Sequence, residues 1–86
     1  MNPVHVKDGG FEVEAGYLAE HFRVRPAEVP ELMRKERIKA VCERGEREDA
    51  GRYRLNFRFG ASRLSLVVDE DGNILRRMSV RWPERV

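Results

Sequence analysis

The sequence has little that would tie it to a membrane or to an oxidising compartment. A single cysteine, Cys42, excludes an internal disulfide and favours a reducing compartment. No stretch approaches the about 18 apolar residues that a bilayer crossing requires. The opening residues, MNPVHVKDGG, lack the apolar run of a secretory signal. We therefore expect a cytoplasmic protein that does not bind a membrane.

A strong excess of one charge is also missing. The chain has 17 Lys and Arg residues against 15 Asp and Glu residues, so its net charge is only +2. Most of the basic residues are arginine, which does not by itself indicate nucleic-acid binding. A length of 86 residues, 41% of them hydrophobic, predicts one domain over residues 1–86 with a modest core.

The clearest pattern lies in residues 38–59, IKAVCERGEREDAGRYRLNFRF, which we interpret as two strands around a charged turn. In the second half, apolar and polar residues alternate. This period of two is typical of a strand with one buried and one exposed face. The predicted core side of this strand carries Tyr53, Leu55, Phe57 and Phe59.

Two further turns extend the predicted sheet. If Gly60 and Ala61 form a two-residue loop, Leu55 faces Leu66, and Phe57 faces Leu64. We therefore expect Leu55, Leu66 and Phe57 to be among the most buried residues.

The last strand follows a predicted three-residue loop over residues 70–72. This loop places Val68 opposite Ile74 and Leu64 opposite Met78, but it leaves Arg76 on the core side. A bulge that brings Leu75 inward would repair that flaw.

The residues before the sheet predict a hairpin, or a single strand, and two short helices. Asp8 and Gly9 form a favoured hairpin turn that places Val6 opposite Phe11. Residues 15–22 have the apolar spacing of an amphipathic helix, and a second helix starts near Val29. Two helices followed by a four-stranded antiparallel meander define an α+β fold.

The predicted outer face of the sheet is rich in arginine, and it is the candidate site. Alternation predicts that five arginines from three successive strands gather there, with Arg58 directly opposite Arg63. Like charges in that position are unfavourable unless RNA, a phosphorylated ligand or an acidic partner binds them. The alternative is a solvated face with internal ion pairs to Glu43, Asp69 and the charged turn. The candidate residues are Arg54, Arg58, Arg63, Arg77 and Arg81.

The two predicted helices also resemble the helix-turn-helix segment of small winged-helix regulators. In that interpretation the second helix enters the major groove of DNA, and residues 38–59 form the wing. Glu28 and Glu31 on the exposed side of that helix argue against it, because phosphates repel them.

Catalytic and metal-binding patterns are nearly absent from the sequence. His5 and His21 lie far apart, with no nucleophile or acid at an informative spacing. Cys42 falls on the predicted core side of its strand, where we expect an inert thiol that reacts slowly with labelling reagents. The acidic residues in and beside the charged turn, Glu43, Glu46, Glu48 and Asp49, do not have the spacing of a calcium-binding loop. We therefore expect no enzymatic activity, no cofactor and no metal.

The segments LMRKERI, CERGEREDAGRYRLNF and LVVDEDGNIL resemble a small bacterial family of uncharacterised proteins that is catalogued only as a domain of unknown function. The resemblance covers roughly residues 11–80, and ERGEREDAGRYRL is its most specific part. Glu36 departs from it, since we expect a helix-ending glycine there. The resemblance implies a stand-alone cytoplasmic domain and brings no activity or ligand with it.

Three functional hypotheses remain. The first is a non-enzymatic binding or regulatory module that forms a homodimer through a sheet edge. The second is a winged-helix-like DNA-binding protein. The third is an accessory subunit of a larger bacterial complex with an acidic partner.

Overall fold

The chain begins with the predicted hairpin. The structure is a computed structural model that describes residues 2–80, and its first strands are β1 (Val4–Lys7) and β2 (Gly10–Val13). Val6 pairs with Phe11, as predicted. Asp8 and Gly9 have φ angles of 45° and 78°, and two successive positive angles define the type I′ turn that favours this dipeptide.

Two helical segments follow the hairpin. α1 (Ala15–Phe22) matches the predicted range, and a short 3-10 turn, η1 (Pro26–Glu28), leads into α2 (Val29–Arg34). Pro30 stands in the first turn of α2, where its missing N–H removes no helical hydrogen bond. The predicted start near Val29 is therefore confirmed.

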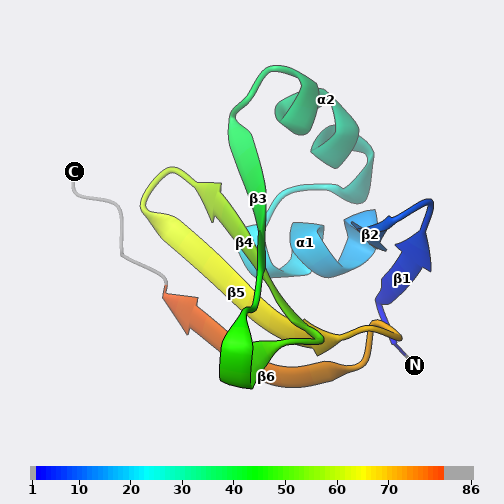
Figure 1. Cartoon of the computed structure of the whole chain (residues 1–86). Coiled ribbons are helices and arrows are strands. Elements are labelled where there is room, and N and C mark those ends of the chain that lie inside the picture. The colour runs from blue at the N-terminus through cyan, green and yellow to red at the C-terminus, as the bar shows by residue number, and fades with distance from the viewer. Residues whose placement is uncertain (1, 81–86) are drawn as a thin grey trace.

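A four-stranded antiparallel sheet forms the second half of the chain. Its strands are β3 (Ile38–Arg44), β4 (Arg52–Phe59), β5 (Ser62–Asp69) and β6 (Ile74–Val80), paired in that order. A 3-10 turn, η2 (Arg47–Asp49), connects β3 to β4. Figure 1 shows α1 lying across one face of the sheet, with α2 beyond the start of β3. The α+β fold and the meander are confirmed.

The register between β4 and β5 is the predicted one. Leu55 pairs with Leu66, and Phe57 pairs with Leu64. Gly60 has a φ angle of 59°, which suits the first position of a two-residue hairpin turn. Because strand residues alternate between faces, this register directs Leu55, Phe57, Leu64 and Leu66 to the helices.

The β5–β6 pair contains a bulge whose effect differs from the prediction. Val68 pairs with Ile74, as expected, but the register then shifts by one residue. Leu75 is the extra residue, and it does not turn inward, since 51% of it is exposed. The extra residue reverses the alternation of everything after it. Leu66 therefore faces Arg77, and Leu64 faces Ser79 in place of the predicted Met78.

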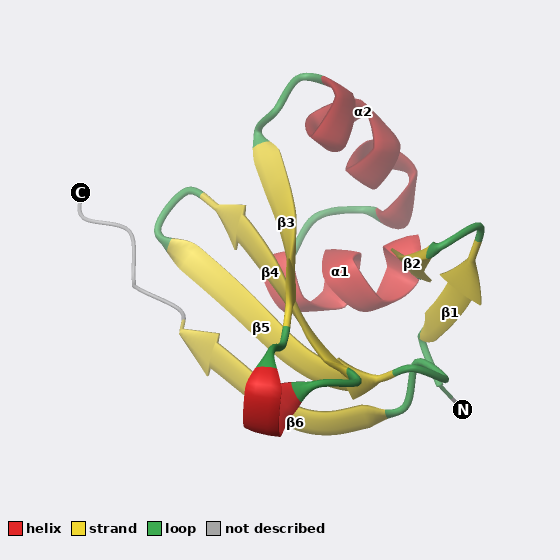
Figure 2. Cartoon of the chain, viewed as in Figure 1, coloured by secondary structure: helices red, strands yellow, loops and turns green. Residues whose placement is uncertain are grey.

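The core lies between the sheet and α1, and the hairpin closes one end of it (Figure 2). Leu55, Leu66 and Phe57 are 4%, 0% and 6% exposed, so their predicted burial is confirmed. The hairpin joins this core through Phe11, whose ring centroid lies 5.0 Å from that of Tyr53 on β4. These contacts make one hydrophobic cluster of the two halves of the chain.

Cys42 is exposed, which makes the prediction of a buried thiol wrong. It does lie on the core side of β3, opposite Leu55. However, only Ile38 at the start of β3 is buried, and the rest of the strand is exposed. A strand's alternation determines which face a side chain occupies, but burial also requires an element that covers that face. No helix or strand among residues 2–80 covers Cys42, so its thiol should react quickly.

Candidate anion-binding face

Three of the five candidate arginines lie together on the outer face of the sheet, away from α1. Arg58 pairs directly with Arg63. Arg54, which pairs with Val67, lies on the same face of β4, and Asn56 lies between it and Arg58. All three side chains are exposed. Arg81 lies outside the described residues.

Arg77 is not part of this face, which corrects the prediction. The bulge turns it toward α1, where its guanidinium carbon lies 5.8 Å from the centre of the Tyr17 ring. A cation above an aromatic face is attracted by the ring's electrons, so Arg77 covers part of the helix layer. The same bulge places Arg76 opposite Val67 on the outer face.

Lys39 is a third cation beside the arginine pair, Arg58 and Arg63. It pairs with Arg58 across β3 and β4, so the three form one row over three strands. The site predicted from the sequence did not include Lys39. The register of β3 against β4 would have found it, because Ile38 opposite Phe59 requires Lys39 opposite Arg58.

The acidic residues near this row have other partners. Glu43 Oε1 accepts a hydrogen bond of 2.8 Å from the Asn56 side-chain amide, and the Asn56 carbonyl oxygen accepts one of 2.6 Å from the Ser65 hydroxyl. Within residues 2–80, neither Arg58 nor Arg63 has an acidic group within ion-pair distance. The alternative prediction of internal ion pairs to Glu43 is therefore wrong.

Asp69, the other predicted ion-pair partner, instead holds the β5–β6 turn. Its carboxylate accepts hydrogen bonds from the Asn73 side-chain amide at 3.0 Å and from the backbone N–H groups of Asn73 and Asp71 at 2.9 Å. The hydrogen bond from the Asn73 side chain is the main cause that holds the pKa of Asp69 below its ordinary value, and the bond from the Asn73 backbone N–H is the second. These bonds occupy the carboxylate at the turn.

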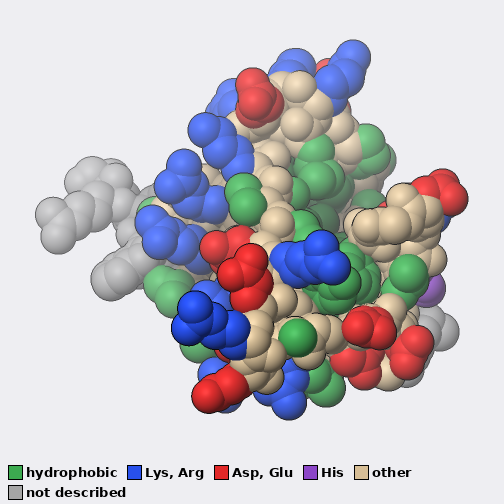
Figure 3. Space-filling view, in the orientation of Figure 1, with side chains coloured by type: hydrophobic (Ala, Val, Ile, Leu, Met, Phe, Trp, Pro, Cys, Tyr) green, Lys and Arg blue, Asp and Glu red, His purple; other side chains and the backbone are tan. Residues whose placement is uncertain are grey.

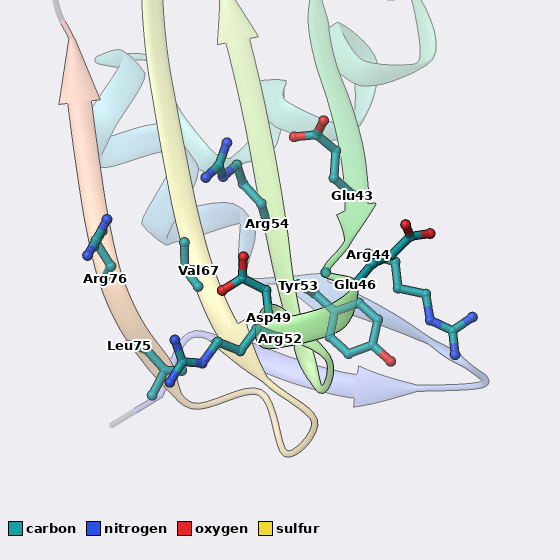
Figure 4. A pocket seen from close by; sticks show the side chains of 11 residues that line it. Glu43, Arg44, Glu46, Asp49, Arg52, Tyr53, Arg54, Val67, Leu75 and Arg76 are labelled. Carbon is teal, nitrogen blue, oxygen red and sulfur yellow. The ribbon is translucent and has the colours of Figure 1, made fainter.

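Two hollows open on the outer face. The smaller, about 420 Å³, lies over the cationic row and the Asn56–Ser65 hydrogen bond, and Glu43 is the one carboxylate in its lining. The larger, about 650 Å³, lies beside the β3–β4 connection. Its lining mixes Glu43, Glu46 and Asp49 with four arginines, Arg44, Arg52, Arg54 and Arg76. Figure 4 shows Asp49 standing among these arginines, with Val67 and Leu75 along one side.

The mixed charge of the larger hollow makes it the poorer anion site. An anion placed there meets three carboxylates as well as the guanidinium groups, and like charges at short range oppose binding. In the smaller hollow, the single carboxylate already accepts a hydrogen bond from Asn56. The arginine pair is therefore the stronger candidate.

The groups with acid–base or nucleophilic chemistry lie on separate elements. His5 on β1 is 2.7 Å from the Glu14 carboxylate, and His21 on α1 is buried, with Nε2 3.2 Å from the Arg63 carbonyl oxygen. Cys42 is on β3. Over residues 2–80, no three His, Cys, Asp or Glu side chains are grouped as a metal site. None of the described helices has the length and apolar character that a bilayer crossing needs.

Together, the fold and the face define an α+β domain with a cationic outer sheet surface. The chain belongs to a family of unknown function (DUF6522), whose profile matches residues 1–85. This match confirms the expected resemblance to an uncharacterised domain. No curated protein and no solved structure matches the chain significantly.

Proposed function

We propose that this protein is a non-enzymatic binding module whose arginine pair, Arg58 and Arg63, binds an anionic group such as a phosphate. The two side chains lie directly opposite each other on β4 and β5, and no described acidic group lies within ion-pair distance of either. The two guanidinium cations repel each other in the free protein, whereas a bound anion between them attracts both.

The chemistry of arginine favours a tetrahedral oxyanion. Each guanidinium presents a planar set of N–H donors that matches two oxygens at once. Side chains directly opposite on neighbouring strands stand about 4.5–5.5 Å apart at their Cβ atoms, so both guanidinium groups can reach one phosphate. Lys39 extends the row toward β3, which favours a ligand with more than one negative charge.

The face is better suited to phosphate groups than to nucleobases. Sheets that bind single-stranded nucleic acids stack the bases on exposed aromatic rings. The described outer-face residues around the row are Val41, Asn56, Ser65, Met78 and Val80, none of which is aromatic. Recognition therefore rests on charge and hydrogen bonds.

The winged-helix alternative has weaker support. α2 has six residues, and the carboxylate of Glu31 in its first turn pairs with Arg34 and, at 3.6 Å, with Lys35. The charges of Arg34 and Lys35 are thus partly neutralised by Glu31, which leaves them less able to attract DNA phosphates. DNA binding and the role of an accessory subunit stay predictions.

The test is a thermal melt in phosphate and in chloride at matched ionic strength. At a phosphate concentration ten times the Kd, the stabilisation of the wild type should be about 1.4 kcal/mol. Added sodium chloride should reduce it, since salt screens the charges. The variant Arg58→Gln with Arg63→Gln should lose the phosphate effect and be at least as stable as the wild type in chloride, because the repulsion is gone.

A matched control is Arg54→Gln with Arg76→Gln, which removes the same charge from the same face. It should keep the phosphate effect. Equal wild-type melting temperatures in the two buffers would overturn the proposal. Loss of the effect in both double variants would mean that the general charge of the face acts, and not the arginine pair.

A further inference from the structure

β3 is an edge strand of the sheet, and its free edge can accept another strand. The Gly45 N–H donates a 2.8 Å hydrogen bond to the Arg52 carbonyl oxygen, directly across β3 and β4. Because bonding alternates along an antiparallel ladder, Glu43, Val41 and Lys39 also bond to β4. The backbone N–H and C=O groups of Ala40 and Cys42 therefore point to the open edge.

The surface beside this edge is apolar and uncovered. A groove of about 280 Å³ runs along the core side of β3, and both Ala40 and Cys42 line it. Figure 3 shows exposed backbone along β3 with hydrophobic side chains beside it. On the other face of the strand, Val41 is 58% exposed. Phe11 and Val13 of the hairpin and Met33 of α2 also line the groove.

We infer that the edge binds β3 of a second copy of this chain, antiparallel, with a two-fold axis at Val41. Each Val41 then meets its counterpart, and Ala40 of one copy lies opposite Cys42 of the other. Lys39 lies opposite Glu43 of the second copy, which gives two symmetric ion pairs. The Glu43 Oε1 atom accepts from Asn56, and Oε2 is left to receive the lysine.

The directions of the backbone N–H and C=O groups restrict how two β3 strands can pair, and only the axis at Val41 places Lys39 opposite Glu43. Residues whose bonding groups face the edge must pair with one another, so the axis passes through a residue and not between two residues. The axes that keep most of β3 paired pass through Ala40, Val41 or Cys42. An axis at Ala40 puts Lys39 opposite Val41, and an axis at Cys42 puts Glu43 opposite Val41. Both leave Lys39 or Glu43 against valine. The axis at Val41 pairs these two opposite charges with each other and places Arg44, at the end of the strand, opposite Ile38.

This self-complementarity favours a second copy over a foreign peptide. In an isologous interface each contact occurs twice, and the sequence KAVCE is matched to its own reverse in charge and in apolar character. The axis is perpendicular to the sheet, so both helix layers lie on the same side and the two grooves meet. The dimer does not require an anion at the arginine pair, which stays on the outer face of each copy, although Lys39 belongs to both surfaces.

The test is charge reversal, measured by sedimentation equilibrium on the whole chain. Lys39→Glu and Glu43→Lys each place two like-charge pairs at the interface, so each dimer should be weakened roughly tenfold or more. An equimolar mixture of the two variants should form a heterodimer, because every pair is then Lys opposite Glu. The variant that carries both substitutions should dimerise as the wild type does.

The single cysteine provides an independent measurement. In this register the two Cys42 residues are diagonal neighbours on one face, about 7–8 Å apart. A short bis-maleimide should cross-link the wild type and the variant mixture, and should cross-link each single variant much less. A wild type that remains monomeric at high concentration would overturn the inference. So would a dimer that neither substitution weakens, since it would use another surface.

Discussion

Replacing Glu36 with glycine should stabilise the protein, although the side chain is on the surface. Glu36 is the second residue after α2 and has a φ angle of 57°. The Glu36 N–H donates to the Met33 carbonyl oxygen at 3.0 Å, and the Arg37 N–H donates to the Leu32 carbonyl oxygen at 2.8 Å. This is the Schellman arrangement, in which glycine is preferred because it has no Cβ.

The magnitude follows from two opposing terms. The left-handed conformation costs a residue with a Cβ about 1–2 kcal/mol. Glycine adds conformational entropy to the unfolded chain, which offsets about 0.4–1 kcal/mol of that gain. The net stabilisation for Glu36→Gly should be about 0.5–1 kcal/mol, which in a domain of this size raises Tm by about 2–8 °C.

The assay is a pair of melts with a matched control. Glu36→Ala removes the same charge but keeps the Cβ in the left-handed conformation, so it should not raise Tm. Chemical denaturation should give the same order of stabilities. A glycine variant that melts below the wild type would contradict a conformational strain at Glu36. An alanine variant as stable as the glycine variant would attribute the gain to the lost charge.

Two further predictions concern the core and the β5–β6 turn. Leu55→Ala should lower the free energy of unfolding by about 2–5 kcal/mol, because Leu55 is 4% exposed within the core, and an unchanged urea midpoint would contradict the sheet packing. Asn73 lowers the pKa of Asp69 in the folded protein, so the unfolded state binds more protons at acid pH. The ionised Asp69 therefore stabilises the fold fully above the unfolded pKa, and this stabilisation is lost as the pH falls below about 4. Asp69→Asn should therefore lose less stability than the wild type between neutral and acid pH in urea titrations, and an equal loss would mean that the carboxylate has no such role.

The sequence determined the parts of this protein that depend on local chemistry. Alternation in β4, together with turn residues such as Asp8, Gly9 and Gly60, was sufficient for two hairpin registers and for the opposition of Arg58 and Arg63. The reason is that a strand's period of two and a turn's length leave one register in which apolar residues meet. The position of the arginine pair was thus predictable from the chain alone.

Tertiary structure decided which predicted faces are covered and where alternation breaks. The single extra residue at Leu75 moved Arg77 to the Tyr17 ring and Arg76 to the outer face, and several placements of a bulge were compatible with the same sequence. Cys42 has the alternation of a core residue and is exposed because the helices do not reach it. A register shift and the coverage of a face both arise from contacts between distant segments, and a local pattern does not contain that information.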